Sequence, residues 1–132
     1  LLISGADRPR YHAGAVLAGN ASVALLEAAR RQLIGVGVDA DVAGRVLARL
    51  LASVADNVTR HGLDEALSGP IRRGDVGTVL RNLDALDAAD PAAAEAYREL
   101  GRITVAVARG LPSGPSGEVA ARLLDALATR RR

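Results

Sequence analysis

Cysteine is absent from the 132-residue sequence. Its absence excludes disulfides, thiolate nucleophiles and cysteine-ligated metal sites, and it fits a reducing cytoplasm, which is where we expect the protein. Lysine is absent as well, since all 17 basic residues are arginine, and this excludes a lysine Schiff base or general acid. Methionine, tryptophan and phenylalanine are also missing. The sequence therefore predicts a core of leucine, valine and alanine.

Aromatic side chains and net charge are both scarce. Only two tyrosines are present, and the net charge is +2 with the acids interspersed among the arginines. A nucleic-acid binder needs a concentrated basic face and often stacking aromatics, so no nucleic-acid partner is expected. The longest uncharged run, residues 11–26, is shorter than the roughly 20 apolar residues of a membrane span. No membrane association is therefore expected.

Helical periodicity is the dominant pattern in a sequence that is 49% hydrophobic and 24% charged, as in an ordinary globular domain. Five helices are predicted. The first covers about residues 9–34, and the next three begin after the N-cap candidates Asp39, Asp75 and Asp90. The fifth follows the linker-like segment GLPSGPSGE. Because no segment keeps the period of a strand for long enough, we expect an all-α, multi-helix bundle.

The first predicted helix is apolar on nearly all sides. Only three residues between positions 13 and 29 are polar, so we expect the other helices to enclose it as the central helix of the bundle. Gly14, Ala18 and Ser22 recur every four residues and form a thin stripe on which another helix can pack closely. That contact can be internal or between subunits.

The later predicted helices each carry an apolar face at helical spacing, and Gly62 is expected to end the second helix. The faces of the second and third helices are Val42, Val46, Leu50, Val54 and Val58, and Val76, Val79, Leu80, Leu83 and Leu86. Those expected to point inward from the fourth and fifth helices are Tyr97, Leu100, Thr104, Val107 and Ala108, and Ala120, Leu123, Leu124 and Leu127.

His12 and Asn20 lie eight residues apart, which at about 100° per residue places Asn20 about 80° beyond two full turns. The two side chains can therefore line one wall of a pocket. In that hypothesis His12 donates or accepts a proton near neutral pH, and Asn20 hydrogen-bonds a polar substrate atom. A buried asparagine without a partner costs about 1–3 kcal/mol, so we expect Asn20 to have a partner or a ligand.

Both residues also have a purely structural interpretation. His12 can lie at the solvent-exposed start of the helix, and Asn20 can bond to a neighbouring helix. Metal binding is not expected, because only His12 and His61 are available and no cysteine is present. A hydrolytic triad is not expected, since no serine stands in a nucleophile-elbow motif.

A second concentration of polar residues is the segment SGPIRRGD, residues 68–75. Ser68, Arg73 and Asp75 can line the mouth of a site, with Arg73 placed for a carboxylate or phosphate. Alternatively, the Gly-Pro pair turns the chain, Arg73 is solvated and Asp75 caps a helix. The segment by itself does not separate these two interpretations.

Together, RPRYHAGAVLAGN and LSGPIRRGD resemble two motifs of one family, a helical domain of unknown function (family 2520) that follows a Rossmann-like domain in NAD(P)-dependent oxidoreductases. The family's first motif reads Tyr-His, small residues and Ala-Ser-Asn, and its second reads Thr-Gly-Pro and then Arg-Gly-Asp. His12 and Asn20 match the first motif, in which Gly19 replaces the serine. Ser68 replaces the threonine of the second. The resemblance covers roughly residues 8–109.

These oxidoreductases are similar to pyrroline-5-carboxylate reductase, ketopantoate reductase and 6-phosphogluconate dehydrogenase, so the resemblance implies a fold like the C-terminal domain of the last. In ketopantoate reductase-like enzymes, a lysine and two asparagines of the central helix face the nicotinamide and the substrate. By this resemblance His12 takes the lysine's place as the catalytic residue, and Val16 replaces the first asparagine. The residues then expected to bind substrate are Asn20, Ser68, Arg73 and Asp75.

The resemblance also implies a domain organisation. Residues 1–8 are expected to be the tail end of a missing N-terminal Rossmann-like domain, and residues 9–132 the helical C-terminal domain. NADP or NAD would be bound mainly by the absent domain, so this fragment alone is expected to be inactive. We expect hydride transfer to or from a small C=O or C=N substrate, and a homodimer. The alternative is a non-catalytic helical interaction or dimerisation module.

Overall fold

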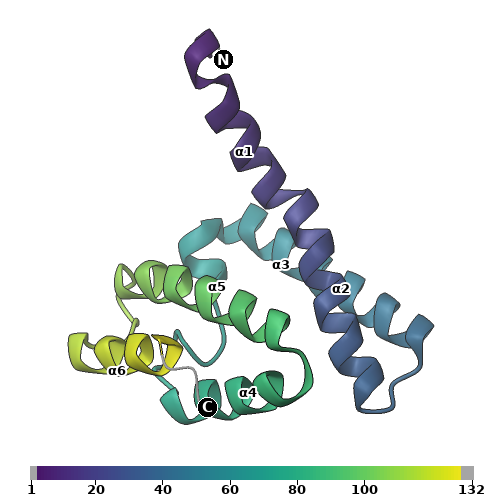
Figure 1. Cartoon of the computed structure of the whole chain (residues 1–132). Coiled ribbons are helices and arrows are strands. Elements are labelled where there is room, and N and C mark those ends of the chain that lie inside the picture. Colours follow the sequence, from purple (N-terminus) through teal and green to yellow (C-terminus); the bar gives the residue numbers. More distant parts are fainter. Residues whose placement is uncertain (1–2, 129–132) are drawn as a thin grey trace. The chain divides into compact units, whose positions relative to one another are not determined.

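A computed structural model describes residues 3–128, and this part of the chain is all-α (Figure 1). It contains no strand, as the sequence predicts. The chain forms two compact units, an N-terminal unit of residues 1–51 and a C-terminal unit of residues 52–132. The elements are a 3-10 helix η1 (Gly5–Asp7) and the helices α1 (Arg8–Ala18), α2 (Asn20–Gly35), α3 (Ala40–Ala66), α4 (Val76–Ala89), α5 (Pro91–Arg109) and α6 (Gly117–Ala128).

The predicted starts of three helices are confirmed. An oxygen of Asp39 accepts two hydrogen bonds of 3.0 Å from backbone amides in the first turn of α3. Asp75 and Asp90 accept bonds of 2.9 and 3.1 Å at the starts of α4 and α5. Each carboxylate satisfies an amide that has no partner within its helix. The predicted end at Gly62 is confirmed too, because Gly62 has φ +80° and ψ 170° and interrupts the helical backbone of α3.

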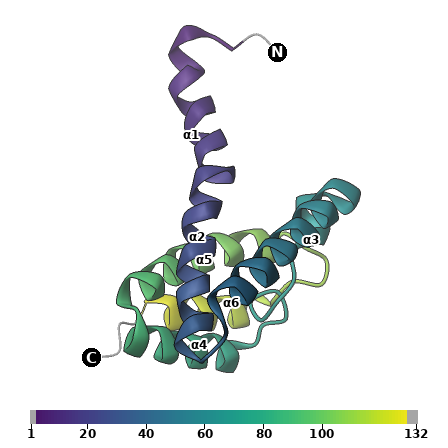
Figure 2. The ribbon, with the colours of Figure 1, turned by 90° about the vertical axis from the view of Figure 1, so that its right-hand side faces the viewer.

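The helix predicted over residues 9–34 is in fact two helices, α1 and α2, which meet at Gly19. In two perpendicular views α2 continues α1 (Figures 1 and 2). The helical bonding of α1 reaches Gly19, whose amide donates to the Ala15 carbonyl over 2.9 Å. Gly19 itself has φ −95° and ψ −79°, at the edge of the right-handed helical region. Glycine has the least restricted backbone of any residue, so the boundary between the two helices lies at the residue whose backbone adapts most easily.

The prediction that this first helical segment is enclosed is wrong for this chain. No residue of α1 or α2 is buried, and 71% of Leu17 and 67% of Val23 are exposed. Ala43 in α3 is the one buried residue among residues 3–51. An apolar helix needs a cover, but its composition does not say whether that cover comes from its own chain.

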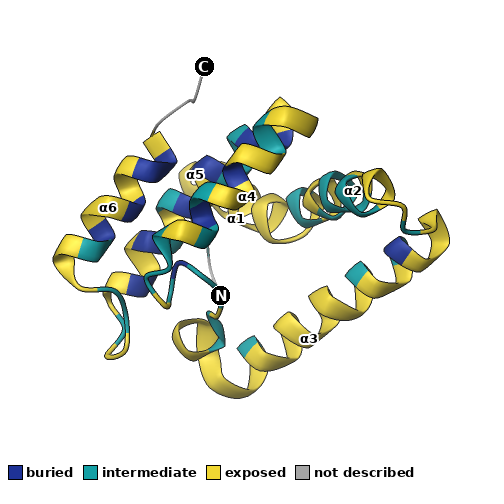
Figure 3. Cartoon of the chain, turned by 90° about the horizontal axis from the view of Figure 1, so that it is seen from below, coloured by how far each residue is buried: buried dark blue, intermediate teal, exposed yellow. Residues whose placement is uncertain are grey.

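The core of the C-terminal unit lies between α4, α5 and α6, which carry most of its buried residues (Figure 3). It is aliphatic, as the composition predicts. Its members are Ile71, Val79, Leu83, Val105, Ala108, Ala120, Leu123 and Leu127. None of the helices in residues 3–128 is both long enough and apolar enough to cross a membrane.

The inward face of α5 differs from the prediction. Leu100 and Val107 are exposed, and so is Leu124 of α6. The buried residues of α5 are Ala93, Ala94, Arg98, Gly101, Val105 and Ala108. Small residues face inward because α5 and α6 lie so close that a Cβ on Gly101 would stand 2.5 Å from a methyl carbon of Leu127.

Candidate functional site

His12 and Asn20 are both exposed, in α1 and at the first position of α2. Gly19, the junction of α1 and α2, lies between them. Asn20 is open to solvent rather than buried, so its amide does not require a partner within the described residues. Neither residue lines either of the two hollows described below. Their roles in catalysis and substrate binding stay predictions.

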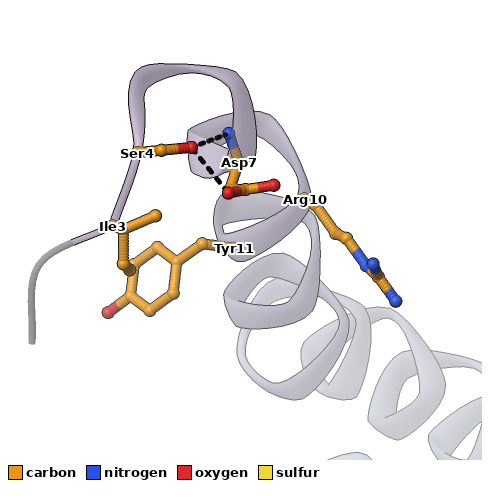
Figure 4. A pocket seen from close by; sticks show the side chains of 5 residues that line it. All are labelled: Ile3, Ser4, Asp7, Arg10 and Tyr11. Atoms are coloured by element: carbon orange, nitrogen blue, oxygen red, sulfur yellow. Dashed lines mark hydrogen bonds between the residues drawn. The ribbon is translucent and has the colours of Figure 1, made fainter.

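A shallow hollow of about 390 Å³ lies at the start of α1 (Figure 4). Two of its polar residues are engaged with each other, because Ser4 Oγ donates to Asp7 Oδ2 over 2.6 Å and accepts from the Asp7 amide over 3.3 Å. Tyr11 lies beside Ile3, and Arg10 extends away from that ring. These bonds cap η1. The hollow therefore has a local structural explanation.

The second motif forms a tight loop that is fixed to the core of the C-terminal unit. Gly69 and Gly74 have φ values of +96° and +70°, which other residues rarely adopt. The Asp75 amide donates to the Pro70 carbonyl over 2.8 Å and closes the turn. Ile71 is 7% exposed and packs in the core. The turn chemistry proposed for this segment is therefore confirmed.

Arg72, a residue that the sequence reasoning missed, holds the loop in place. Its Nη1 donates to the Glu65 carbonyl over 3.2 Å and also to the Leu67 carbonyl, and its Nη2 donates to Ser113 Oγ over 3.1 Å. The neighbouring Arg73, predicted to bind substrate, is exposed. The sequence contains a weak signal for this role of Arg72. The short helical turn after Gly62 leaves carbonyl groups without helical partners, and a following arginine can donate to them.

Asp75 uses both carboxylate oxygens to cap α4. Oδ1 accepts from the Thr78 amide over 2.9 Å, and Oδ2 accepts from the Thr78 hydroxyl over 2.6 Å. These hydrogen bonds, with a smaller contribution from the charges of Arg81 and Arg73, hold the pKa of Asp75 below its usual value of 3.8. The capping interpretation is confirmed, whereas a substrate contact by Asp75 stays a prediction.

Asp75→Asn is expected to lower the melting temperature near neutral pH and to have little effect in strong acid. A folded-state pKa below the unfolded value means that the charged form stabilises the fold above about pH 4, and this stabilisation is lost as the pH falls through the lowered pKa. Asparagine keeps one capping oxygen for the Thr78 amide and, like a protonated carboxyl group, has a donor in place of the second acceptor, so it resembles the uncharged form of Asp75. Thermal melts from about pH 7 to about pH 2 measure the difference, and a constant difference across that range would contradict the prediction.

An apolar groove of about 440 Å³ lies in the C-terminal unit between the end of α3, the residues that follow it and α5. Ser68 of the second motif lines this groove, whereas Arg73 and Asp75 do not. Its other polar residues are Asp64 and Thr104. The predicted site residues are therefore distributed over the two units, with His12 and Asn20 in one and Ser68, Arg73 and Asp75 in the other.

The fold and the two motifs define an all-α helical domain with one motif in each unit. Residues 1–104 match the family DUF2520, described as a domain of unknown function, and the chain belongs to this family. No curated protein and no solved structure matches the sequence. The family description assigns no activity.

Proposed function

We propose that the chain is the C-terminal substrate-binding and dimerisation domain of a cytoplasmic NAD(P)-dependent oxidoreductase, with the fold of the 6-phosphogluconate dehydrogenase C-terminal domain. Its substrate is a small molecule with a C=O or C=N bond. The observation that supports this proposal is that Ser68, from the second motif of a DUF2520 member, lines a groove of about 440 Å³. That volume lies within the range of small-molecule sites.

In this proposal NADP or NAD supplies or accepts the hydride. Residues 3–128 contain no strand, and therefore no strand, glycine-rich turn and helix of the kind that binds a dinucleotide. The nucleotide is then held mainly by residues outside this chain. His12 gives a proton to the substrate oxygen or nitrogen, and Asn20 orients that atom by a hydrogen bond. One hydride and one proton together convert a C=O to an alcohol or a C=N to an amine.

Homodimer formation through α1 and α2 is part of the proposal. Gly14, Ala18 and Ser22 are not buried, and a Cβ on Gly14 would meet no atom within 4 Å. A glycine inside a helix costs about 0.5–1 kcal/mol relative to alanine, and no contact among residues 3–128 accounts for that cost. A close approach by the same stripe of a second copy would account for it.

Replacing the proposed catalytic residue tests this function in the intact protein. His12→Gln is expected to lower kcat for NAD(P)H-dependent reduction by about 10²–10⁴-fold, the usual contribution of a general acid. Nucleotide binding and the helical circular dichroism spectrum should be unchanged, because His12 is exposed. His61→Gln is the matched control, since His61 is the only other histidine and is also exposed; it should retain full turnover.

Two outcomes would contradict the proposal. Equal turnover of the His12→Gln and His61→Gln proteins would remove His12 from catalysis. Absence of NAD(P)H binding by the intact protein, measured by fluorescence titration, would favour the alternative of a non-catalytic dimerisation module. The exposed apolar side chains of α1 and α2 are the observation that favours that alternative.

A further inference from the structure

The groove of the C-terminal unit has aliphatic walls and one charged residue. The hydrophobic lining residues are Val54, Val58, Leu63, Ala66, Leu67, Ile103 and Val107. Asp64 is the only ionisable residue in the lining. The site is therefore suited to a hydrocarbon group that carries a hydrogen-bond donor or a positive charge at one end.

Asp64 and Ser68 are the polar groups of the groove that are available to a ligand. Within residues 3–128, Asp64 forms no ion pair and the hydroxyl of Ser68 forms no hydrogen bond. Thr104 differs from them, because its hydroxyl donates to the Leu100 carbonyl over 2.7 Å. Asp56, which precedes Gly62 in α3, also differs, since it pairs with Arg60 over 3.0 Å. A free carboxylate beside apolar walls favours a cationic group over an anionic one.

We propose that this groove binds a protonated aliphatic amine, with its ammonium group at Asp64 and Ser68 and its hydrocarbon part between α3 and α5. An ammonium has donors for both the carboxylate and the hydroxyl. A carboxylate ligand would meet the like charge of Asp64, and the nearby Arg72 has both terminal nitrogens engaged in hydrogen bonds. Whether this amine is a substrate or product of a reaction rests on the proposed oxidoreductase function. If it is, the substrate of that function carries a C=N bond rather than a C=O bond. The binding itself does not rest on it.

Binding of three ligands of one length to this chain tests the proposal. Hexylamine, hexanol and hexanoate carry the same hydrocarbon with a positive, neutral or negative head group near pH 7. We expect hexylamine to bind up to about fivefold more tightly than hexanol, the effect of one ion pair with an exposed carboxylate, and hexanoate to bind most weakly. Titrations followed by nuclear magnetic resonance should shift the signals of Val54, Ile103 and Val107.

Two variants separate a specific contact from general attraction to acidic protein. Asp64→Asn should abolish the preference for the amine and leave hexanol binding unchanged. Glu118→Gln is the matched control, because Glu118 is an exposed acid of the same unit outside the groove, and it should keep the preference. Equal binding of amine and alcohol, a preference that survives Asp64→Asn, or no binding in the groove would each overturn the proposal.

The titration also distinguishes this proposal from the proposed function. It uses no nucleotide and measures no turnover, so loss of amine binding would leave the His12 experiment intact. Conversely, the chain can bind the amine while the intact protein neither binds NAD(P)H nor reduces an imine. That result would support the amine site and contradict the proposed oxidoreductase function. If dimerisation displaces all three ligands and the amine is not preferred, the groove is instead a contact site for a second copy of the chain, and the amine proposal is wrong.

Discussion

Asp87→Ala is expected to lower the free energy of unfolding by about 3 kcal/mol, because it removes one partner of a buried charge. Arg98 of α5 is 2% exposed and pairs with Asp87 of α4 and, over 3.2 Å, with Glu95. Its Nε is buried and has no hydrogen-bond partner in the described part of the chain. The carboxylates therefore compensate a guanidinium that has little access to water. Urea denaturation followed by circular dichroism measures the loss.

Two further variants show whether burial is the cause of this loss. Glu99→Ala removes a partner of Arg102 at the surface, where the two side chains are 68% and 37% exposed, and should cost less than about 1 kcal/mol. Asp87→Leu combined with Arg98→Met removes the buried guanidinium together with Asp87 and should be less destabilising than Asp87→Ala alone, because the acid that stays, Glu95, is 42% exposed and can be solvated by water. If Asp87→Ala costs no more than Glu99→Ala, the buried pair does not stabilise the fold.

The sequence predicted best those features that depend on neighbouring residues. Asp39, Asp75 and Asp90 were identified as helix caps, and each accepts a hydrogen bond from an amide two or three residues later. Gly62 was identified as a helix end for the same local reason. Such interactions form within one turn of the chain, so a short segment contains all the partners.

Burial was predicted less well because it depends on distant partners. Leu100 was expected to point inward because it is large and apolar, yet the neighbouring Gly101 is buried there instead. Arg98 would be placed on the surface by composition alone, and its pairing with Asp87 of another helix and with Glu95 accounts for its burial. The exposure of α1 and α2 has the same origin, since their composition predicts that they need a cover but not which chain provides it.

The candidate site was predictable in part. The motif resemblance selected Ser68, which lines the groove, and the turn and cap around it were readable from glycine and aspartate. The roles of Asp64 and Arg72 could not be predicted. Arg72 depends on the carbonyl groups that the fold brings near it, and Asp64 depends on the apolar residues that surround it in the groove. An isolated carboxylate in a sequence does not reveal whether an arginine will neutralise it. That knowledge requires the tertiary structure.

Leu127→Ala is expected to destabilise the chain by about 3 kcal/mol, because Leu127 is fully buried in the core and its removal leaves a cavity. Gly101 lies directly against it, and a Cβ there would stand 2.5 Å from one Leu127 methyl carbon and 3.1 Å from the other. Gly101→Ala in the wild-type chain should therefore be neutral or destabilising, since overpacking of about 1–3 kcal/mol opposes a helix-propensity gain of about 1 kcal/mol.

Combining the two substitutions should reverse the sign of the glycine effect. With Leu127 shortened to alanine, the methyl group of Gly101→Ala enters the vacated space, so we expect it to stabilise the Leu127→Ala chain by about 1 kcal/mol. Gly44→Ala is the matched control, because a Cβ on this helical glycine of α3 would meet no atom within 4 Å; it should give the same small stabilisation in both backgrounds. Denaturant midpoints of the four chains in each cycle measure the coupling. If Gly101→Ala has the same effect in both backgrounds, the close approach of α5 and α6 is not what requires glycine at this position.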